Sequence, residues 1–193
     1  MTRRHAPPAG EAVASFAGRH LHRHVRVEEQ GPRATLAYDD ARVQLDLGGI
    51  AKGHGVDRAA DVLRLWGVTS ALVNVGGDLV AIGSAAGSEP WRIGIQDPSD
   101  ERRVIGTVNL VDAAIATSGS YQQYFRHRGH RYHHLLDPAT GAPRVTPVQS
   151  LTIQARCCRD ADAAATALYG MDAERAAAIL AARAPGATIV RST

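Results

Sequence analysis

A chain of 193 residues with 45% hydrophobic and 21% charged residues is long enough to fold as one domain, or as one lobe of a larger domain, around a sizeable core. The net charge of +3 and the scattered arginines do not indicate a nucleic-acid-binding protein. Two adjacent cysteines exclude a secreted disulfide framework, and no apolar run approaches the ~18 residues of a membrane-spanning helix.

The amino-terminal part of the chain predicts little regular structure before a group of short strands. Its first ten residues are basic and rich in proline, and we expect them to be loosely ordered. No apolar segment follows this basic start, so the sequence as written predicts no signal peptide and no export. A short helix is predicted over residues 11–21. Strands with alternating apolar residues are predicted at 25–27, 34–38 and 43–47.

The periodicity changes after Gly53, where apolar residues from Val56 to Leu63 predict an amphipathic helix that ends near Gly67. The stretch before this helix, residues 46–53, holds three glycines and Lys52, the only lysine among 22 basic residues. Free N–H groups at such a strand-to-helix junction bind anions, and the compact ammonium group of lysine suits a narrow phosphate pocket. The alternative is that a single lysine stands here by chance.

The remainder of the chain predicts many strands and then two helices. The helices are expected at about 159–169 and 172–183, before a last strand at 188–190. Strands are predicted at 70–75, 79–83, 91–96, 106–110, 113–117, 131–138 and 150–155. This order predicts an α+β fold with a large, mostly antiparallel sheet flanked by helices, in a single domain or lobe.

Asp162 and Thr166 form the first candidate site. They stand four residues apart on a predicted helix, so a carboxylate and a hydroxyl group share one face. Hard oxygen ligands of this kind suit Mg²⁺. The alternative is that the aspartates near this helix start serve only to offset the helix dipole.

Two other segments carry polar side chains suited to chemistry. His134, which follows His133 in a predicted strand, can transfer a proton near neutral pH, although a structural role is the alternative. Thr117, Ser118 and Gly119 form a predicted ligand-lining turn of hydroxyl groups, and an ordinary strand end is the alternative there.

Five segments occur in the order seen in the ApbE family, whose members are FAD:protein FMN transferases. These segments are 46–53, 74–78, 116–119 with Tyr121, 134–141 and 161–167. From about Val43 to its C-terminus the chain therefore resembles this family. The resemblance implies an ApbE-like fold and an enzyme that splits FAD at its pyrophosphate. Such an enzyme attaches FMN through its phosphate to a threonine of a target protein and releases AMP, with Mg²⁺ as the required metal.

The resemblance also implies residue roles. The side chains of Asp162 and Thr166 and the backbone carbonyl of Gly49 would bind Mg²⁺, and His134 matches the histidine thought to assist the transfer. Lys52 and Asp162 join His134 as the expected catalytic residues. The residues expected to contact FAD are Asp46, Lys52, Thr117, Ser118, Gly119 and Leu136.

One departure from the family concerns the amino-terminal portion, which normally supplies part of the FAD pocket and is represented here by about 45 residues. We therefore expect residues 1–40 to be a divergent or truncated segment and residues 41–193 to be the ApbE-like domain. The expected partners are FAD and an acceptor protein with a target threonine, by resemblance a redox or membrane electron-transfer subunit. Family members are often exported or attached to a membrane, so the compartment stays open. Two other functions remain: an FAD pyrophosphatase, and a flavin-binding protein without catalysis.

Overall fold

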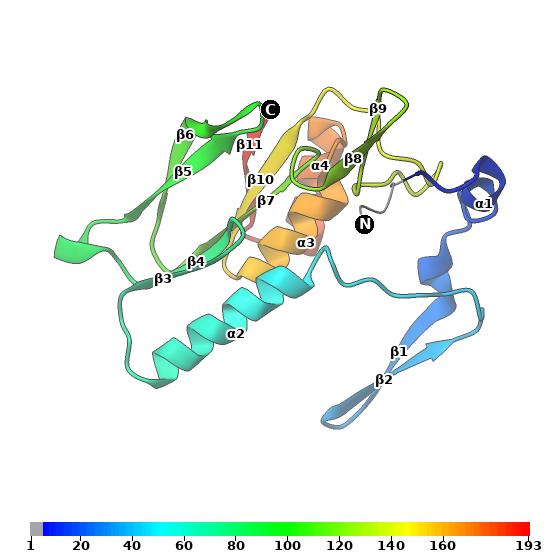
Figure 1. Ribbon diagram of the computed structural model, residues 1–193. Helices are drawn as coiled ribbons and strands as arrows, with labels where there is room; N and C mark the ends of the chain where they lie inside the picture. The colour runs from blue at the N-terminus through cyan, green and yellow to red at the C-terminus, as the bar shows by residue number, and fades with distance from the viewer. Residues whose placement is uncertain (1–5) are drawn as a thin grey trace, which may run out of the picture. The chain divides into compact units, whose positions relative to one another are not determined.

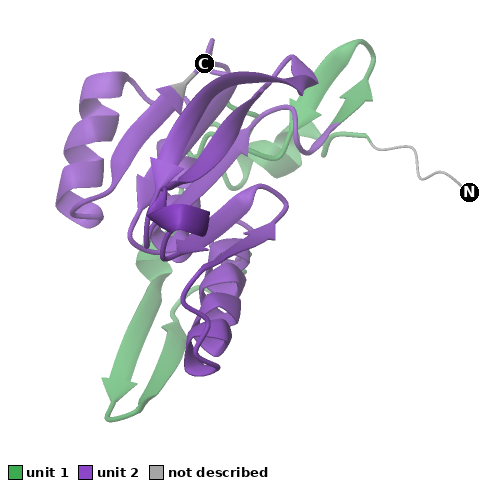
Figure 2. Cartoon of the chain, turned by 90° about the vertical axis from the view of Figure 1, so that its left-hand side faces the viewer, with its two compact units in different colours: residues 1–46, 125–144 green, residues 47–124, 145–193 purple. Residues whose placement is uncertain are grey.

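A computed structural model of the protein describes residues 6–193 and divides the chain into two compact units (Figure 2). The first unit comprises residues 1–46 and 125–144, and the second comprises residues 47–124 and 145–193. Each unit is described by itself below. The boundary expected between residues 1–40 and 41–193 stays a prediction.

The first unit contains short elements only. Its strands pair as two hairpins, β1 with β2 and β8 with β9. The predicted helix over 11–21 is wrong in extent, because α1 ends at Ala14 and Gly18 adopts a left-handed φ of 66° that a helix cannot continue. The strand predicted at 43–47 is also wrong, since these residues have no regular structure. The elements of this unit are α1 (Gly10–Ala14), the 3-10 helix η1 (Leu21–His24), β1 (Val25–Gln30), β2 (Arg33–Tyr38), β8 (Tyr124–His127) and β9 (His130–His133).

The second unit is built on an antiparallel sheet of five strands in the order β11-β10-β7-β4-β3 (Figure 1). These strands are β3 (Ala71–Val75), β4 (Asp78–Ile82), β7 (Ala114–Gly119), β10 (Ser150–Ala155) and β11 (Thr188–Ser192). The other elements are α2 (Ala51–Leu65), the 3-10 helix η2 (Ala86–Ser88), β5 (Trp91–Asp97), β6 (Asp100–Leu110), α3 (Cys158–Leu168) and α4 (Ala173–Arg183). The predicted α+β fold with a mostly antiparallel sheet and flanking helices is confirmed.

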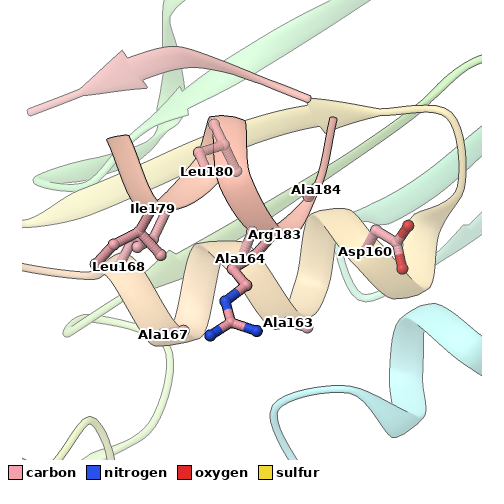
Figure 3. A pocket seen from close by; sticks show the side chains of 9 residues that line it. All are labelled: Asp160, Ala163, Ala164, Ala167, Leu168, Ile179, Leu180, Arg183 and Ala184. Atoms are coloured by element: carbon pink, nitrogen blue, oxygen red, sulfur yellow. The ribbon is translucent and has the colours of Figure 1, made fainter. Parts of the chain in front are cut away.

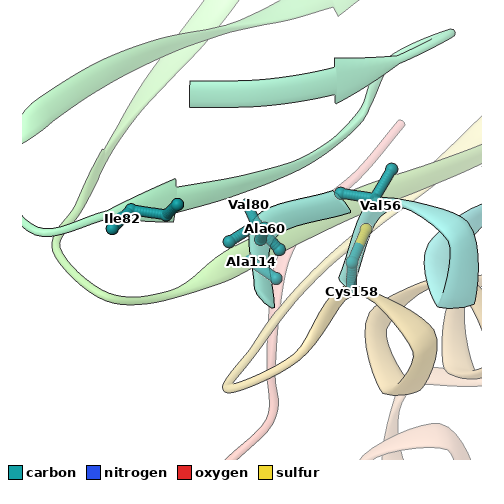
Figure 4. Close-up of a cluster of buried hydrophobic side chains, with 6 residues drawn as sticks. All are labelled: Val56, Ala60, Val80, Ile82, Ala114 and Cys158. Carbon is teal, nitrogen blue, oxygen red and sulfur yellow. The ribbon is translucent and has the colours of Figure 1, made fainter. Parts of the chain in front are cut away.

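The two faces of the sheet have different covers, because successive side chains of a strand point to opposite sides. Val80 and Ile82 of β4 pack against Val56 of α2 and Cys158 of α3 (Figure 4). Leu79 and its neighbours on the other face pack against β6 through a cluster of Leu79, Ala81, Leu110 and Ile115. Each of these buried aliphatic side chains stabilises the fold by about 1.5–3 kcal/mol.

The hairpin between β3 and β4 has a two-residue turn, Gly76-Gly77, in which both glycines have positive φ angles of 61° and 96°. Such turns match the twist of an antiparallel pair and favour glycine. The side-chain oxygen of Asn74 accepts the N–H of Gly77 at 3.0 Å and closes the turn. The turn thereby fixes Asp78 as the first residue of β4.

The two cysteines are free thiols, as expected. Burial raises the pKa of the Cys158 thiol far above its usual range, so this group is a neutral member of the core. Within the described residues, no helix combines the length and the apolar content needed to cross a lipid bilayer.

Candidate functional site

Lys52 occupies the first turn of α2 and pairs with a carboxylate from the sheet. Its Nζ atom lies 2.5 Å from Oδ2 of Asp78, whose side chain is only 2% exposed, whereas that of Lys52 is 34% exposed. Burial raises the pKa of Asp78, while Lys52 and the backbone N–H of Thr117 act in the opposite direction. The buried carboxylate of Asp78 therefore fixes the position of the lysine ammonium group, while the lysine side chain stays partly accessible to a ligand.

Asp162 lies on the face of α3 that meets the start of α2. Its Oδ2 accepts the backbone N–H of Gly53 at 2.9 Å, and the residue is 4% exposed. A β-carbon on Gly53 would lie 2.4 Å from the carbonyl oxygen of Cys158 and 2.8 Å from Cβ of Asp162. Gly53 is therefore required because a side chain there would push the two helices apart.

Thr166 follows one turn later on α3 and meets the glycine turn before α2. A β-carbon on Gly49 would lie 2.9 Å from Cγ2 of Thr166, so the backbone of Gly49 runs directly over this side chain. The hydroxyl groups of Thr166 and Ser118 lie 3.0 Å apart. Ser118 belongs to β7, so β7 and α3 both bring a hydroxyl group to this point, beside the backbone of Gly49.

The two helices hold each other's amino-terminal ends. Asp57 of α2 accepts the N–H groups of Cys158 and Arg159 at 2.8 and 2.9 Å, and so satisfies the start of α3. Asp162 of α3 accepts an N–H group at the start of α2. The reciprocal capping aligns the two helices and sets the register between the glycine turn and the pair Asp162–Thr166.

The charges and donor atoms of this site suit a hard cation. Asp78 and Asp162 place two buried carboxylates near one another, and Lys52 is the cation paired with Asp78. The hydroxyl groups of Thr166 and Ser118 add neutral oxygen donors. Within residues 6–193, no cluster of three or more His, Cys, Asp or Glu side chains gathers to hold a metal. A site with one available carboxylate and several neutral oxygens fits Mg²⁺, which completes its shell with water and substrate oxygens.

Among the residues predicted to line the flavin site, Thr117 and Ser118 point to opposite faces of the sheet. The hydroxyl group of Thr117 lies 2.9 Å from that of Thr152, whereas Ser118 faces Thr166. Gly119 ends β7 against the ring of Tyr121, where a β-carbon would lie 2.4 Å from the ring. Among these three residues, only Ser118 therefore directs its side chain toward Thr166.

Three other predicted residues, Asp46, His134 and Leu136, belong to the first unit. His134 follows the end of β9, so it is not within a strand as expected, and Leu136 forms an isolated bridge with Pro143. The turn after Leu136 is capped by its own side chain, because Oδ1 of Asp137 accepts the N–H of Ala139 at 2.8 Å. Roles of the three residues toward FAD stay predictions.

Sequence reasoning did not include Asp78 among the site residues. The segment of residues 74–78 was part of the family resemblance, but an acid after a Gly-Gly turn is ordinary in a hairpin. The pairing with Lys52 joins residues far apart in the sequence, and only the folded sheet brings them together.

Two cavities lie in the second unit. One, of about 230 Å³, lies between α3 and α4 and is bordered mainly by alanine and leucine side chains, with Asp160 and Arg183 at its margin (Figure 3). The other, of about 420 Å³, lies on the face of the sheet that carries β5 and β6, and is lined by Asn74, Thr117 and Thr152 among others. Neither is lined by Asp162 or Thr166.

Comparison with known proteins agrees with this architecture. An FAD:protein FMN transferase of Vibrio cholerae is 42% identical over 146 residues, which are 75% of this chain and 44% of that protein. One of Treponema pallidum is 37% identical over 179 residues, which are 88% of this chain and 49% of that protein. The crystal structure of the ApbE protein of Thermotoga maritima superposes with a TM-score of 0.82 and 34% identity, over 96% of this chain and 60% of that one.

The chain thus spans about half the length of the curated relatives that it matches. The helices that carry Lys52, Asp162 and Thr166 lie within the part of the chain that the family model matches. The family match itself extends over residues 1–190. The chain belongs to the ApbE family.

Proposed function

We propose that this chain carries the metal and pyrophosphate portion of an FAD:protein FMN transferase site. In the proposed reaction, the bond between the phosphorus atom of the FMN half of FAD and the bridging oxygen of the pyrophosphate breaks, and AMP leaves with that oxygen. The hydroxyl oxygen of a threonine on an acceptor protein forms the new bond to the FMN phosphate. The names of the relatives support FAD and a protein acceptor, while Mg²⁺, the threonine and the release of AMP are part of the proposal.

The observation that carries the proposal is the meeting of three segments at the start of α2. The backbone of Gly49 lies against Thr166, Asp162 accepts the N–H of Gly53, and Lys52 lies in the first turn of the same helix. A helix start, a lysine and a hard-cation site next to each other suit a substrate with adjacent phosphates.

Each residue then has a defined task. The Asp162 carboxylate, the Thr166 hydroxyl and the Gly49 carbonyl would hold Mg²⁺, which when bound would neutralise negative charge on the pyrophosphate. Lys52, oriented by Asp78, contacts a pyrophosphate oxygen and stabilises charge that develops during transfer. His134 accepts the proton of the threonine hydroxyl as a general base.

The test is incubation of the full chain with FAD, Mg²⁺ and a threonine-bearing acceptor protein, followed by a denaturing gel. Flavin fluorescence that stays with the acceptor is the expected result. Release of FMN and AMP without labelling of the acceptor would show hydrolysis instead of transfer.

Two variants define the role of the metal site. Asp162→Asn keeps the side-chain shape and removes the charge, so labelling should fall by at least about a hundredfold. Asp160→Asn changes a neighbouring, exposed acid of the same helix and should label as the wild type does. Normal labelling by Asp162→Asn, or no FAD binding by the wild-type chain, would overturn the proposal.

A further inference from the structure

The face of the sheet opposite the proposed metal site carries the polar cavity of about 420 Å³. The proposed reaction assigns no role to this cavity. It lies between β5 and the sheet face formed by β3, β4, β7 and β10, and it reaches the Gly76-Gly77 turn. Its polar lining consists of amide and hydroxyl side chains, namely Asn74, Gln96, Thr117, Gln122 and Thr152, with the guanidinium group of Arg92.

Arg92 is the charged residue that lines this cavity. Within residues 6–193 no carboxylate pairs with it, whereas Arg103 on the same hairpin is held by Asp97. A single guanidinium without an internal partner favours one carboxylate on a ligand.

The cavity reaches β3, the edge strand of the sheet, at Leu72 and Asn74. β3 is the last strand of the five-stranded sheet, and no strand of the described chain pairs with its outer side. Leu72 and Val75 on this strand are 39% and 50% exposed. An unpaired edge presents a row of backbone N–H and C=O groups, which can pair with another extended chain.

The cavity meets the proposed reaction site at the Gly76-Gly77 turn. A β-carbon on Gly76 would lie 3.9 Å from Cδ of Lys52, so this turn borders both the cavity and the stem of the lysine. A chain that pairs with β3 and runs toward its C-terminal end therefore arrives beside Lys52.

We infer that the edge of β3 and the adjoining cavity bind an extended segment of the acceptor protein, with an acidic residue of that segment on Arg92 and its threonine beyond the Gly76-Gly77 turn. This inference rests on the proposed function. Pairing with β3 supplies affinity independent of sequence, and the cavity supplies selection of side chains. An extended peptide fits the row of backbone groups, and amide side chains can both donate to and accept from a peptide backbone. A nucleotide or flavin ring would leave the strand edge unpaired.

Synthetic peptides test the inference without catalysis. Fluorescein-labelled peptides of about eight residues, the length of an ordinary strand, carry one central threonine flanked by either aspartate or lysine. Their binding to the full chain is measured by fluorescence anisotropy without FAD or Mg²⁺, so that no transfer takes place. The aspartate peptides should bind the wild type about three- to tenfold more tightly than the lysine peptides. N-methylation of alternate peptide nitrogens should weaken binding further, because it removes donors to the strand edge.

Charge reversal on the hairpin supplies the matched pair of variants. Arg92→Glu should reverse the preference between the two peptides, whereas Arg102→Glu, an equal change at an exposed position of β6 outside the cavity lining, should preserve it. The affinity for FAD, followed by flavin fluorescence, should be the same in both variants.

Three outcomes overturn the inference: equal peptide preferences in Arg92→Glu and Arg102→Glu, no measurable binding of any peptide, or a loss of FAD affinity confined to Arg92→Glu. The last would place part of FAD in the cavity. Failure of the transferase proposal gives a different pattern. In that case the wild-type chain does not bind FAD, but Arg92→Glu and Arg102→Glu still differ in their preference between the two peptides.

Discussion

The two faces of the central sheet differ in chemistry although they share the same strands. The face under α2 and α3 buries carboxylates, at Asp78 and Asp162, and brings hydroxyl groups within 3.0 Å of each other beside them. The face under β5 and β6 has a polar cavity with amides, hydroxyls and one arginine. The first is suited to a cation and phosphates, and the second is suited to a peptide.

β7 shows how one strand serves both faces. Thr117 contributes its hydroxyl group to the cavity side, at 2.9 Å from Thr152, and Ser118 contributes its hydroxyl group to Thr166 on the helix side. Successive side chains on a strand diverge, so neighbours in sequence take part in different sites. A motif of adjacent hydroxyl residues therefore does not define a single pocket.

The largest expected effect concerns the close contact between α2 and α3, the helices that cover one face of the sheet (the helix face). Gly53→Ala places a methyl group within 2.4 Å of the Cys158 carbonyl oxygen, so α2 and α3 must separate. The free energy of unfolding should fall by about 2–4 kcal/mol in urea denaturation. The control is Gly55→Ala, two residues later in α2, where nothing lies within 4 Å and the change should be neutral or stabilising by up to about 1 kcal/mol. Equal destabilisation of the two variants would contradict the close contact.

A pair of threonine variants separates the two faces by metal binding. Thr166→Val keeps the shape of the side chain and removes the hydroxyl group, so the affinity for Mg²⁺ should fall by at least about tenfold. Thr152→Val removes a similar hydroxyl contact on the opposite face and should leave Mg²⁺ binding unchanged. Mg²⁺-induced stabilisation, measured by thermal unfolding with and without the ion, reports the difference. Unchanged Mg²⁺-induced stabilisation in Thr166→Val would contradict a metal site between α2 and α3.

A smaller effect is expected from the cap that aligns the two helices. Asp57→Ala removes the acceptor for two N–H groups at the start of α3 and should cost about 1–2 kcal/mol in the free energy of unfolding. Asp61→Ala, on the same helix, breaks exposed ion pairs with Arg58 and Arg64 and should change it by less than about 1 kcal/mol. Similar losses for the two variants in urea denaturation would show that the cap contributes nothing beyond a surface charge.

The smallest effect is a pH dependence that belongs to the helix face alone. Burial raises the pKa of Asp78 above its usual value of 3.8, so the folded protein keeps a proton there after the unfolded chain has lost it. That contribution is fully present below the unfolded value and is lost as the pH rises through the folded one. The free energy of unfolding of the wild type relative to Asp78→Asn should therefore decrease between about pH 4 and about pH 7. A difference that is constant or increases over this range would contradict the raised pKa.

Much of the second unit could be predicted from the sequence. The apolar run of residues 70–75, its predicted hairpin mate at 79–83 and the apolar spacing from Val56 to Leu63 correspond to β3, β4 and α2. In the first unit, local pattern located β1 and β2, but the apolar alternation of residues 43–47 finds no strand partner and the helix predicted over 11–21 ends early. A strand needs a partner for its backbone groups, and alternation alone does not supply one.

By itself the sequence determined the local chemistry: a glycine-rich turn before a helix with the only lysine, and an acid and a hydroxyl one helical turn apart. These follow from spacing within a few residues, which the backbone geometry of a helix fixes. Only the tertiary structure decided that Gly53 contacts Asp162, that Asp78 holds Lys52 and that Thr117 and Ser118 serve different faces. Those contacts join residues up to about a hundred positions apart, and they depend on sheet order and helix packing, which no local pattern encodes.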